Sequence, residues 1–257
     1  MRLEMPGELA AAYTSPSQRT RVVSEAWGEE NLYCSNCTSD RLRRLPTNTP
    51  ALDYECPQCA SLFQLKSQRH RFATRINDAA YKKMCEAILQ RRTPNILALH
   101  YDAERWRVRS LILVPSFAFS LSCIEKRKPL SLSAERARWV GCNILLVNIP
   151  PDARIPVVAD GKPNNPVWVR RQYDRLRPLA KVAVEARGWT LDVLNAVRSF
   201  GRREFTLAEV YAHEGGLRRL HPQNLHVHDK IRQQLQRLRD LGFVEFLGKG
   251  KYGIIRP

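Results

Sequence analysis

The clearest chemical signature in the sequence is a set of four cysteines arranged as two close pairs. Cys34-x-x-Cys37 is followed, after eighteen residues, by Cys56-x-x-Cys59. Two pairs at this spacing can surround one ion tetrahedrally with four thiolates, as structural zinc sites do. We therefore predict that these four cysteines bind one zinc ion. The three other cysteines of the chain have no partner at ligand spacing, and we interpret them as small core residues.

A second group of residues has the chemistry of a divalent-metal site. Asp53 precedes the second cysteine pair, and Gln64-Leu65-Lys66 follows it. Gln64 and Lys66 share one face of a strand because side chains alternate, and an adjacent antiparallel strand would bring Asp53 opposite them. A metal-dependent nuclease needs an acidic ligand, a second oxygen ligand and a lysine that assists the attacking water or neutralises the phosphate. The alternative is an ordinary surface aspartate and lysine, since many strands match so short a pattern.

From this group we predict a magnesium site and three catalytic residues, Asp53, Gln64 and Lys66. Asp53, Gln64 and the backbone carbonyl of Leu65 should hold magnesium, and Lys66 should assist the attacking water. The predicted zinc site lies between the two halves of this group, so it would fasten the hairpin that carries them.

A third group of residues could read a nucleic acid. Residues 225–241 place apolar side chains on one helical face, which leaves glutamines and arginines on the other. Glutamine suits the hydrogen-bonding edge of adenine, and arginine suits that of guanine. The predicted contacts are Lys230, Arg232, Gln233, Gln236, Arg237 and the hairpin lysines Lys249 and Lys251. The same charges could equally form a solvated helix face.

The elements that must position these groups form an α/β (α+β) arrangement in the first part of the chain. Residues 62–66, 95–101 and 107–114 have the patterns of strands, and residues 8–27 and 76–91 have helical spacing. The proline-rich stretch 150–178 is interpreted as extended surface chain. Its arginines, with Arg170 first among them, would contact phosphates if they bind anything.

The last part of the chain has the pattern of a winged helix-turn-helix. Leu191, Leu194 and Val197 indicate one short helix, and the capping box Thr206-x-x-Glu209 begins a second. The helix of residues 225–241 and a hairpin, with strands at 243–247 and 251–255, complete the motif. In this motif the third helix enters the major groove. The alternative is a winged helix that binds protein.

The charge of the chain favours a polyanionic partner. Forty-two Lys and Arg against 25 Asp and Glu give a net charge of +17 and a pI near 10. Neutralising phosphates releases condensed counterions, so DNA is expected ahead of an anionic membrane surface. No apolar stretch has the length of a transmembrane helix or of a signal core, so we expect a cytoplasmic protein. Nothing in the sequence indicates an obligate protein partner.

The chain resembles the DpnI-like methyl-directed restriction endonucleases along nearly its whole length. The matching stretches include Tyr33-Cys34-x-Asn36-Cys37, Leu65-Lys66-Ser67, Ile76-Asn77-Asp78, Gly141-Cys142-Asn143-Ile144, Arg187-Gly188-Trp189-Thr190, Lys230 to Gln236 and Gly248-x-Gly250-Lys251-Tyr252. The resemblance implies a PD-(D/E)XK nuclease core with a zinc ribbon-like insertion and a winged helix that senses methylated DNA. It also implies a GATC target methylated on the exocyclic amine of adenine.

The resemblance adds candidate residues and exposes one departure. Arg136, Arg138 and Trp139 form a basic cluster with an aromatic, and the resemblance makes Trp139 a candidate contact to the target step, although a tryptophan is more often a core residue. The family has a glutamate where this chain has Gln64. An amide oxygen can still bind magnesium, but the site then has one negative charge fewer. Glu55 could replace that charge, an alternative we favour less.

Together these patterns predict a magnesium-dependent, methylation-dependent endonuclease in two domains. Residues 1–186 would form the zinc-containing nuclease domain with a basic linker, and residues 187–257 the winged-helix domain. The alternative from another functional class is a non-catalytic zinc and winged-helix DNA-binding regulator whose nuclease centre has decayed through Gln64.

Overall fold

The chain divides into two compact units in the computed structural model, which describes residues 1–47, 49–131, 133, 135 and 137–255. The first unit comprises Met1–Ile76, Thr93–Ser116 and Ala153–Arg175; the second comprises Asn77–Arg92, Phe117–Asp152 and Leu176–Pro257. Each unit is assembled from segments that are far apart in the sequence. Among the described residues, no helix is long and apolar enough to cross a membrane.

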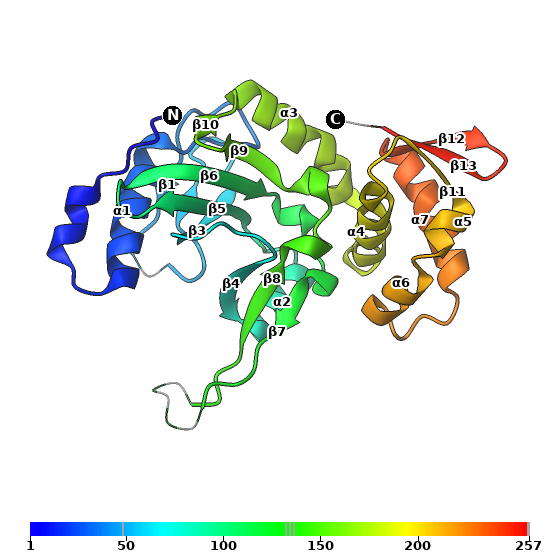
Figure 1. Ribbon diagram of the computed structural model, residues 1–257, viewed down its shortest axis with the longest axis horizontal. Helices are drawn as coiled ribbons and strands as arrows, with labels where there is room; N and C mark the ends of the chain where they lie inside the picture. Colours follow the sequence, from blue (N-terminus) through cyan, green and yellow to red (C-terminus); the bar gives the residue numbers. More distant parts are fainter. Residues whose placement is uncertain (48, 132, 134, 136, 256–257) are drawn as a thin grey trace. The chain divides into compact units, whose positions relative to one another are not determined.

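The first unit is built on a seven-stranded sheet with the order β1-β2-β3-β5-β6-β9-β10 (Figure 1). Its strands are β1 (Arg43–Arg44), β2 (Tyr54–Glu55), β3 (Leu62–Gln68), β5 (Asn95–Asp102), β6 (Arg107–Val114), β9 (Ile155–Ala159) and β10 (Lys162–Pro163). Only the β3–β5 pair is parallel. The three strands predicted in this region are confirmed: the alternating β3 is partly buried, and the apolar residues of β5 and β6 are buried in the centre of the sheet.

Helix α1 (Pro16–Asn31) contacts β3, and the 3-10 helix η1 (Gly7–Ala12) contacts α1. The single helix predicted for residues 8–27 is therefore wrong in its extent. Pro16 lies at the first position of α1, where its missing N–H costs nothing, and the chain before it is extended at Ser15. Trp27 and Val23 bury the inner face of α1 almost completely.

The proline-rich stretch 150–178 is not the extended surface chain that its composition predicts. It contains β9, β10 and helix α3 (Pro166–Leu176). Pro166 begins the helix, and Val169, Tyr173 and Leu176 are buried at helical spacing. The prolines indicated loops, but Pro166 begins a helix and Pro163 lies in the edge strand β10, two positions with which proline is compatible.

The second unit contains a three-stranded sheet with the order β4-β8-β7 and helix α2 (Tyr81–Leu89). The strands are β4 (Arg75–Ala80), β7 (Ile124–Lys126) and β8 (Gly141–Leu145). The helix predicted from residue 76 is wrong over its first turn, because residues 75–80 form β4 and pair with β8. The apolar spacing of this segment fits either element, and pairing with a strand 60 residues later decided it. Short 3-10 helices follow at Ser116–Ala118, Leu121–Cys123, Leu146–Asn148, Pro151–Ala153 and Arg177–Lys181.

The C-terminal part of the second unit has the elements of a winged helix. Its elements are α4 (Val184–Ser199), α5 (Leu207–Tyr211), α6 (Glu214–Leu220), α7 (Val227–Asp240), β11 (Glu204–Thr206), β12 (Val244–Gly248) and β13 (Lys251–Ile254). The strands form a sheet with the order β11-β13-β12. The predicted capping box at Thr206 and Glu209 is confirmed in both of its hydrogen bonds. Helix α6 was not predicted, since its two glycines hide its short pattern.

Three polar contacts connect α4 to the preceding part of the second unit. The buried Asp192 carboxylate accepts a hydrogen bond from the Ser122 hydroxyl at 2.8 Å and lies 2.7 Å from Nε2 of His221. Arg198 forms an ion pair with Asp152, and the Asn195 amide donates to a backbone carbonyl at residue 147. The winged helix and residues 117–152 are therefore joined by polar contacts at three positions along α4.

Candidate metal centre and nucleic-acid interface

The candidate metal centre lies where β2 separates from β3. Tyr54 pairs with Phe63, but one residue earlier the chain leaves the regular ladder. The Asp53 N–H donates to the Phe63 carbonyl at 3.0 Å, and Oδ2 of Asp53 accepts the Leu65 N–H at 2.7 Å. The carboxylate thus replaces the next bond of the ladder and is fixed against the segment that carries Gln64 and Lys66. The structure brings together the three residues that the sequence analysis grouped.

One oxygen ligand of this centre, that of the Gln64 amide, has no protein partner among the described residues. Gln64 is only 9% exposed, and within the described part of the chain its amide makes no hydrogen bond. The amide is not fully enclosed, so its oxygen is accessible to an ion or to water at this site. With the Asp53 carboxylate beside it, the donor set is the oxygen-rich kind that magnesium prefers. These residues fit the predicted ion.

The electrostatics of Asp53 reflect burial opposed by cations. Burial raises the pKa of the Asp53 carboxyl above its usual value, and the Leu65 N–H together with the charges of Lys66, Arg44 and Arg21 opposes that rise. A bound divalent cation would favour the charged form further. The two arginines were missed by the sequence analysis, because they lie on β1 and α1 and carry no local motif.

A second carboxylate, Glu25 of α1, belongs to the same charged cluster. It forms an ion pair with Arg44, and the Tyr54 hydroxyl donates to its backbone carbonyl at 2.7 Å. Glu55, the alternative source of the missing charge, instead pairs with Arg43 of β1 at 2.6 Å. Of the two glutamates, it is therefore Glu25 that pairs with Arg44, the arginine whose charge also acts on Asp53.

The four paired cysteines converge on one point. Their Sγ atoms all lie within 4.8 Å of one another, with Cys34 and Cys59 at 3.6 Å and Cys37 and Cys56 at 3.5 Å. A tetrahedral zinc with bonds of about 2.3 Å has sulfur–sulfur edges of about 3.8 Å, close to these separations. The cluster could bind zinc, as its spacing predicted, and its second pair lies in the turn between β2 and β3.

Arg170 of α3 ties the first cysteine pair to the body of the first unit. Its guanidinium donates to the carbonyls of Cys34 at 3.0 Å and Ser39 at 2.9 Å and lies over the ring of Tyr33. This is a correction, because the sequence analysis offered Arg170 as a phosphate contact. Its donors are used within the protein, where they hold the backbone of the cysteine cluster.

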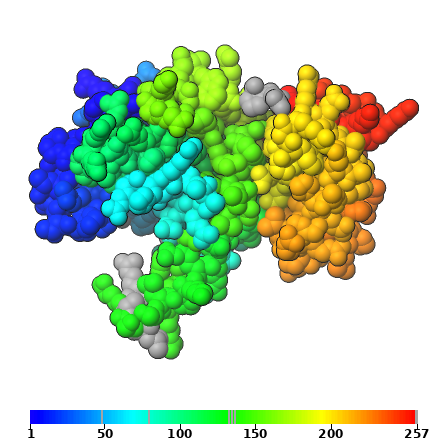
Figure 2. All heavy atoms as spheres, in the orientation of Figure 1, coloured from blue at the N-terminus to red at the C-terminus, as the bar shows by residue number. Residues whose placement is uncertain are grey.

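The connection between β7 and β8 forms a long hairpin that carries Trp139 and Arg138. Beyond the sheet its two arms stay bonded, since the Leu130 N–H donates to the Trp139 carbonyl at 2.9 Å. The described residues of this hairpin stand out from the surface around them (Figures 1 and 2). Arg138 is exposed and Trp139 half-buried, so both are available to a partner. Arg136, the third member of the predicted cluster, lies outside the described residues.

Gly141 explains how Trp139 is oriented on this hairpin. A Cβ atom at this glycine would come within 2.7 Å of the Trp139 ring, so the indole lies directly over the glycine backbone. Any larger residue would displace the ring. The tryptophan ring therefore packs on the first residue of β8 and stays half-buried, which argues against its being a core residue.

Helix α7 presents the predicted reading face to the outside of its own fold. Ile231, Leu235 and Leu238 are buried, whereas Gln233 and Gln236 are exposed, as their spacing predicted. Lys230 is half-buried, and the exposed Arg232 forms an ion pair with Asp229. In the wing, both lysines are exposed, Lys249 in the turn between β12 and β13 and Lys251 at the start of β13.

Arg237, the remaining predicted contact, is held by a fully buried residue of the same helix. Its guanidinium donates to Oε1 of Gln234 at 2.9 Å, and the Thr190 hydroxyl of α4 donates to the same oxygen at 2.8 Å. The Gln234 amide nitrogen donates to Gln233 at 3.1 Å. Gln234 thus connects the helix core to two outward residues, a role that helical periodicity does not reveal because it predicts an apolar side chain there.

Two family models match the chain. The model described as "DpnI: Dam-replacing family" matches residues 1–182, which is more than half of the chain. The model described as "Dam-replacing HTH domain" matches residues 185–253. The first match includes the candidate metal centre, the cysteine cluster and the projecting hairpin. The second match includes the winged helix.

Proposed function

The chain belongs to the Dam-replacing family of DpnI-like methyl-directed restriction enzymes, and on this premise we propose that it is a magnesium-dependent endonuclease that hydrolyses double-stranded DNA at adenine-methylated sites. The target that the family resemblance favours is GATC with a methyl group on the exocyclic amine of adenine. The observation that supports catalysis most directly is the bond from the Leu65 N–H to the Asp53 carboxylate, because it holds Asp53 beside Gln64 and Lys66.

In this proposal Asp53, Gln64 and the Leu65 carbonyl hold magnesium, within a PD-(D/E)XK type of core. When bound there, magnesium would supply Lewis-acid stabilisation of the charge that develops on the phosphate. Lys66 follows Leu65 on β3, and its ammonium orients the attacking water and offsets the same charge. The zinc-binding cysteine cluster keeps β2 and β3 in register, so that Asp53 stays against this segment.

The proposed reading of methylated DNA uses two separate surfaces. Arg138 and Trp139 of the projecting hairpin would contact the target step, and α7 with the wing lysines would provide a second reading from the winged-helix domain. Burial of one methyl group contributes only about 0.8 kcal/mol, so a single surface discriminates weakly. Two methyl-sensing surfaces would multiply their preferences. We also propose the domain division at residues 1–186 and 187–257.

A non-catalytic DNA-binding regulator is the second candidate, and Gln64 is the observation that favours it. One experiment separates the two functions: incubation of the purified protein and its Lys66→Ala variant with magnesium and plasmid DNA, either adenine-methylated or unmethylated. We expect the wild type alone to cut, and to cut only methylated plasmid. Binding of both plasmids with no cleavage by the wild type at any magnesium concentration would favour the regulator.

A further inference from the structure

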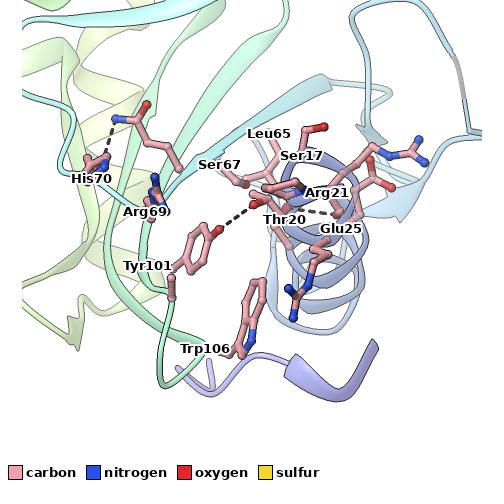
Figure 3. A pocket seen from close by; sticks show the side chains of 15 residues that line it. Ser17, Thr20, Arg21, Glu25, Leu65, Ser67, Arg69, His70, Tyr101 and Trp106 are labelled. Carbon is pink, nitrogen blue, oxygen red and sulfur yellow. Dashed lines mark hydrogen bonds between the residues drawn. The ribbon is translucent and has the colours of Figure 1, made fainter. Parts of the chain in front are cut away.

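Strand β3 is supported differently towards its two ends. In its C-terminal half, Leu65 and Ser67 line a cleft together with the first half of α1, a helix that contacts this strand (Figure 3). At its N-terminal end the strand continues directly from the second cysteine pair, with Ser61 next to its first residue. Whatever holds Ser61 therefore helps to fix the start of the strand on which the candidate metal centre is built.

Asn36, which lies within the first cysteine pair, reaches Ser61 across the cluster. Its side-chain nitrogen donates to Oγ of Ser61 at 2.8 Å and to Sγ of Cys59 at 3.6 Å. Its backbone N–H donates to Sγ of Cys34 at 3.3 Å. One residue thus contacts a sulfur of each cysteine pair and the residue that precedes β3.

The Ser61 hydroxyl completes a chain of hydrogen bonds that ends on Cys59. Its oxygen lies 3.2 Å from Sγ of Cys59. A zinc-bound cysteine is a thiolate and can only accept, so the hydroxyl must donate its one proton to the sulfur. The hydroxyl oxygen then accepts the N–H of Asn36, which is the direction of the 2.8 Å bond. Because both bonds run from Asn36 towards the sulfur, each strengthens the other.

The first cysteine pair receives backbone donors instead. Cys34 and Cys37 accept N–H groups of Asn36 and Ser39, each two residues further along the chain. These bonds depend on the path of the backbone, whereas the donors to Cys59 are side chains that can be removed one at a time. Hydrogen bonds to a ligating sulfur offset the negative charge that four thiolates concentrate around the ion.

We propose that Asn36 and Ser61 are positioning residues of the zinc site. They join the two cysteine pairs, and by donating to the Cys59 thiolate they determine how firmly the ion is held. Both act on the ion through a ligand sulfur. The inference rests on the zinc site of the proposed function, and it concerns retention of that ion, independently of DNA cleavage.

The test compares zinc retention by the full-length wild type with that of variants that keep all four cysteines. Transfer of zinc to a chromogenic chelator measures the zinc affinity of Asn36→Ala, Asn36→Asp, Ser61→Ala and the double alanine variant. Gln58→Ala is the matched amide control, because the exposed Gln58 turns its oxygen towards Sγ of Cys37 at 3.6 Å and an oxygen cannot donate to a thiolate. Thr38→Ala is the matched hydroxyl control, at an exposed residue beside the first pair.

We expect Asn36→Ala and Ser61→Ala each to weaken zinc binding about tenfold. Asn36→Asp keeps the shape of the side chain but turns a carboxylate oxygen towards the sulfur, so its zinc affinity should fall further than that of Asn36→Ala. The double variant should lose less than the sum of the single losses, because Asn36 acts partly through Ser61. Both controls should bind zinc as the wild type does.

Cobalt in place of zinc gives a readout that a general loss of stability would not change. The sulfur-to-cobalt charge-transfer absorption depends on the energy of the sulfur lone pairs, which a donated hydrogen bond lowers. This band should therefore move to longer wavelength in Asn36→Ala and Ser61→Ala. In the two control variants it should stay where it is in the wild type.

Unchanged zinc affinity and an unchanged cobalt band in the Asn36 and Ser61 variants would overturn the proposal, as would a wild type that holds no zinc. Strictly additive losses would show that the two residues do not form a chain. None of these readouts involves DNA. A protein that holds zinc as expected but never cuts would contradict the nuclease proposal and leave this one standing. A protein that cuts, and whose zinc affinity ignores both residues, would do the reverse.

Discussion

Gln64 is a neutral amide at a position where the family resemblance predicts a carboxylate. The residues around it determine how much this difference changes the affinity of the site for magnesium. The amide is buried and makes no hydrogen bond within the described residues, while Lys66, Arg44 and Arg21 act on the neighbouring Asp53. A site with several cations and one fewer anion attracts magnesium less strongly. The expected consequence is a weakened metal affinity rather than a lost mechanism, since the amide oxygen remains a ligand.

Restoring the carboxylate should lower the magnesium requirement. We expect Gln64→Glu to reach half-maximal cleavage at a lower magnesium concentration, with methyl dependence unchanged. Gln64→Ala removes the oxygen and should impair cleavage, but less than Lys66→Ala or Asp53→Ala, for which a loss on the order of 100-fold or more in rate is expected. Magnesium titrations of cleavage by the wild type and the four variants measure these differences.

Glu55→Gln is the control for that series, because the same carboxylate-to-amide change is made at a glutamate paired with Arg43. It should leave the magnesium requirement unchanged. If Gln64→Glu slows cleavage, the site evolved around a neutral side chain and another carboxylate completes its charge. If Gln64→Ala cleaves as well as the wild type at every magnesium concentration, Gln64 is not a ligand and our assignment of the site is wrong.

At the scale of elements, the cysteine cluster and the β2–β3 hairpin depend on each other. The second cysteine pair occupies the turn between these strands, and the first pair precedes β1, which pairs with β2. Arg170 adds bonds from α3 to the same backbone. Loss of the ion would therefore loosen both the edge of the sheet and the Asp53 position that the edge determines.

Purified protein should contain about one zinc per chain, the load of a closed four-thiolate site. Cys34→Ser or Cys56→Ser should lose the zinc and lower the melting temperature by about 10 °C, which corresponds to roughly 3–5 kcal/mol for a domain of this size. Cys85→Ser changes a cysteine outside the cluster, so this variant should retain the zinc. Metal analysis by mass spectrometry and thermal unfolding measure both effects. Active, stable protein without zinc would rule out the site.

The buried Gln234 connects α4 to α7, and its removal should be costly. Gln234→Leu keeps the volume but removes the acceptor shared by the Thr190 hydroxyl, which retains the Ala186 carbonyl, and the half-buried Arg237 guanidinium, so we expect a loss of about 1 kcal/mol in the free energy of unfolding. Thr190→Val completes a double-mutant cycle. Coupling between the two substitutions in urea unfolding is expected; strictly additive effects would show that the bond contributes nothing.

Local patterns predicted those elements whose residues carry their own signal. The cysteine pairs, the alternating strand β3, the apolar strands β5 and β6 and the capping box at Thr206 need no distant partner to be recognised. The errors came where tertiary context decides: residues 75–80 have a spacing that suits a helix or a strand, and pairing with β8 made them a strand. In the same way, Arg44 and Arg21 join Asp53 only through folding, so no local motif could reveal them.

At the scale of the whole molecule, a net charge of +17 supplies affinity for any duplex, whereas preference for methylated sites must come from few residues. The two kinds of contact are expected on different elements of the winged helix. Gln233 and Gln236 lie on the exposed face of α7, and the lysines Lys249 and Lys251 lie on the wing. Base contacts carry specificity and phosphate contacts carry salt-dependent affinity, so the two sets can be separated by experiment.

Substitutions in the full-length protein should therefore split into two classes. Lys249→Gln and Lys251→Gln should weaken binding to methylated and unmethylated duplexes equally, and each should reduce the salt slope by about one unit. Gln233→Ala and Gln236→Ala should leave the salt slope unchanged and reduce the preference for methylated DNA by about five- to tenfold, since a base-edge contact contributes roughly 1–3 kcal/mol of discrimination. Dissociation constants for both duplexes across a salt series measure both quantities.

The hairpin residues should preserve part of the preference for methylated DNA in these variants, because Trp139 would read the target independently. If the lysine changes alter the preference, or the glutamine changes affect both duplexes alike, α7 does not read the methylated site.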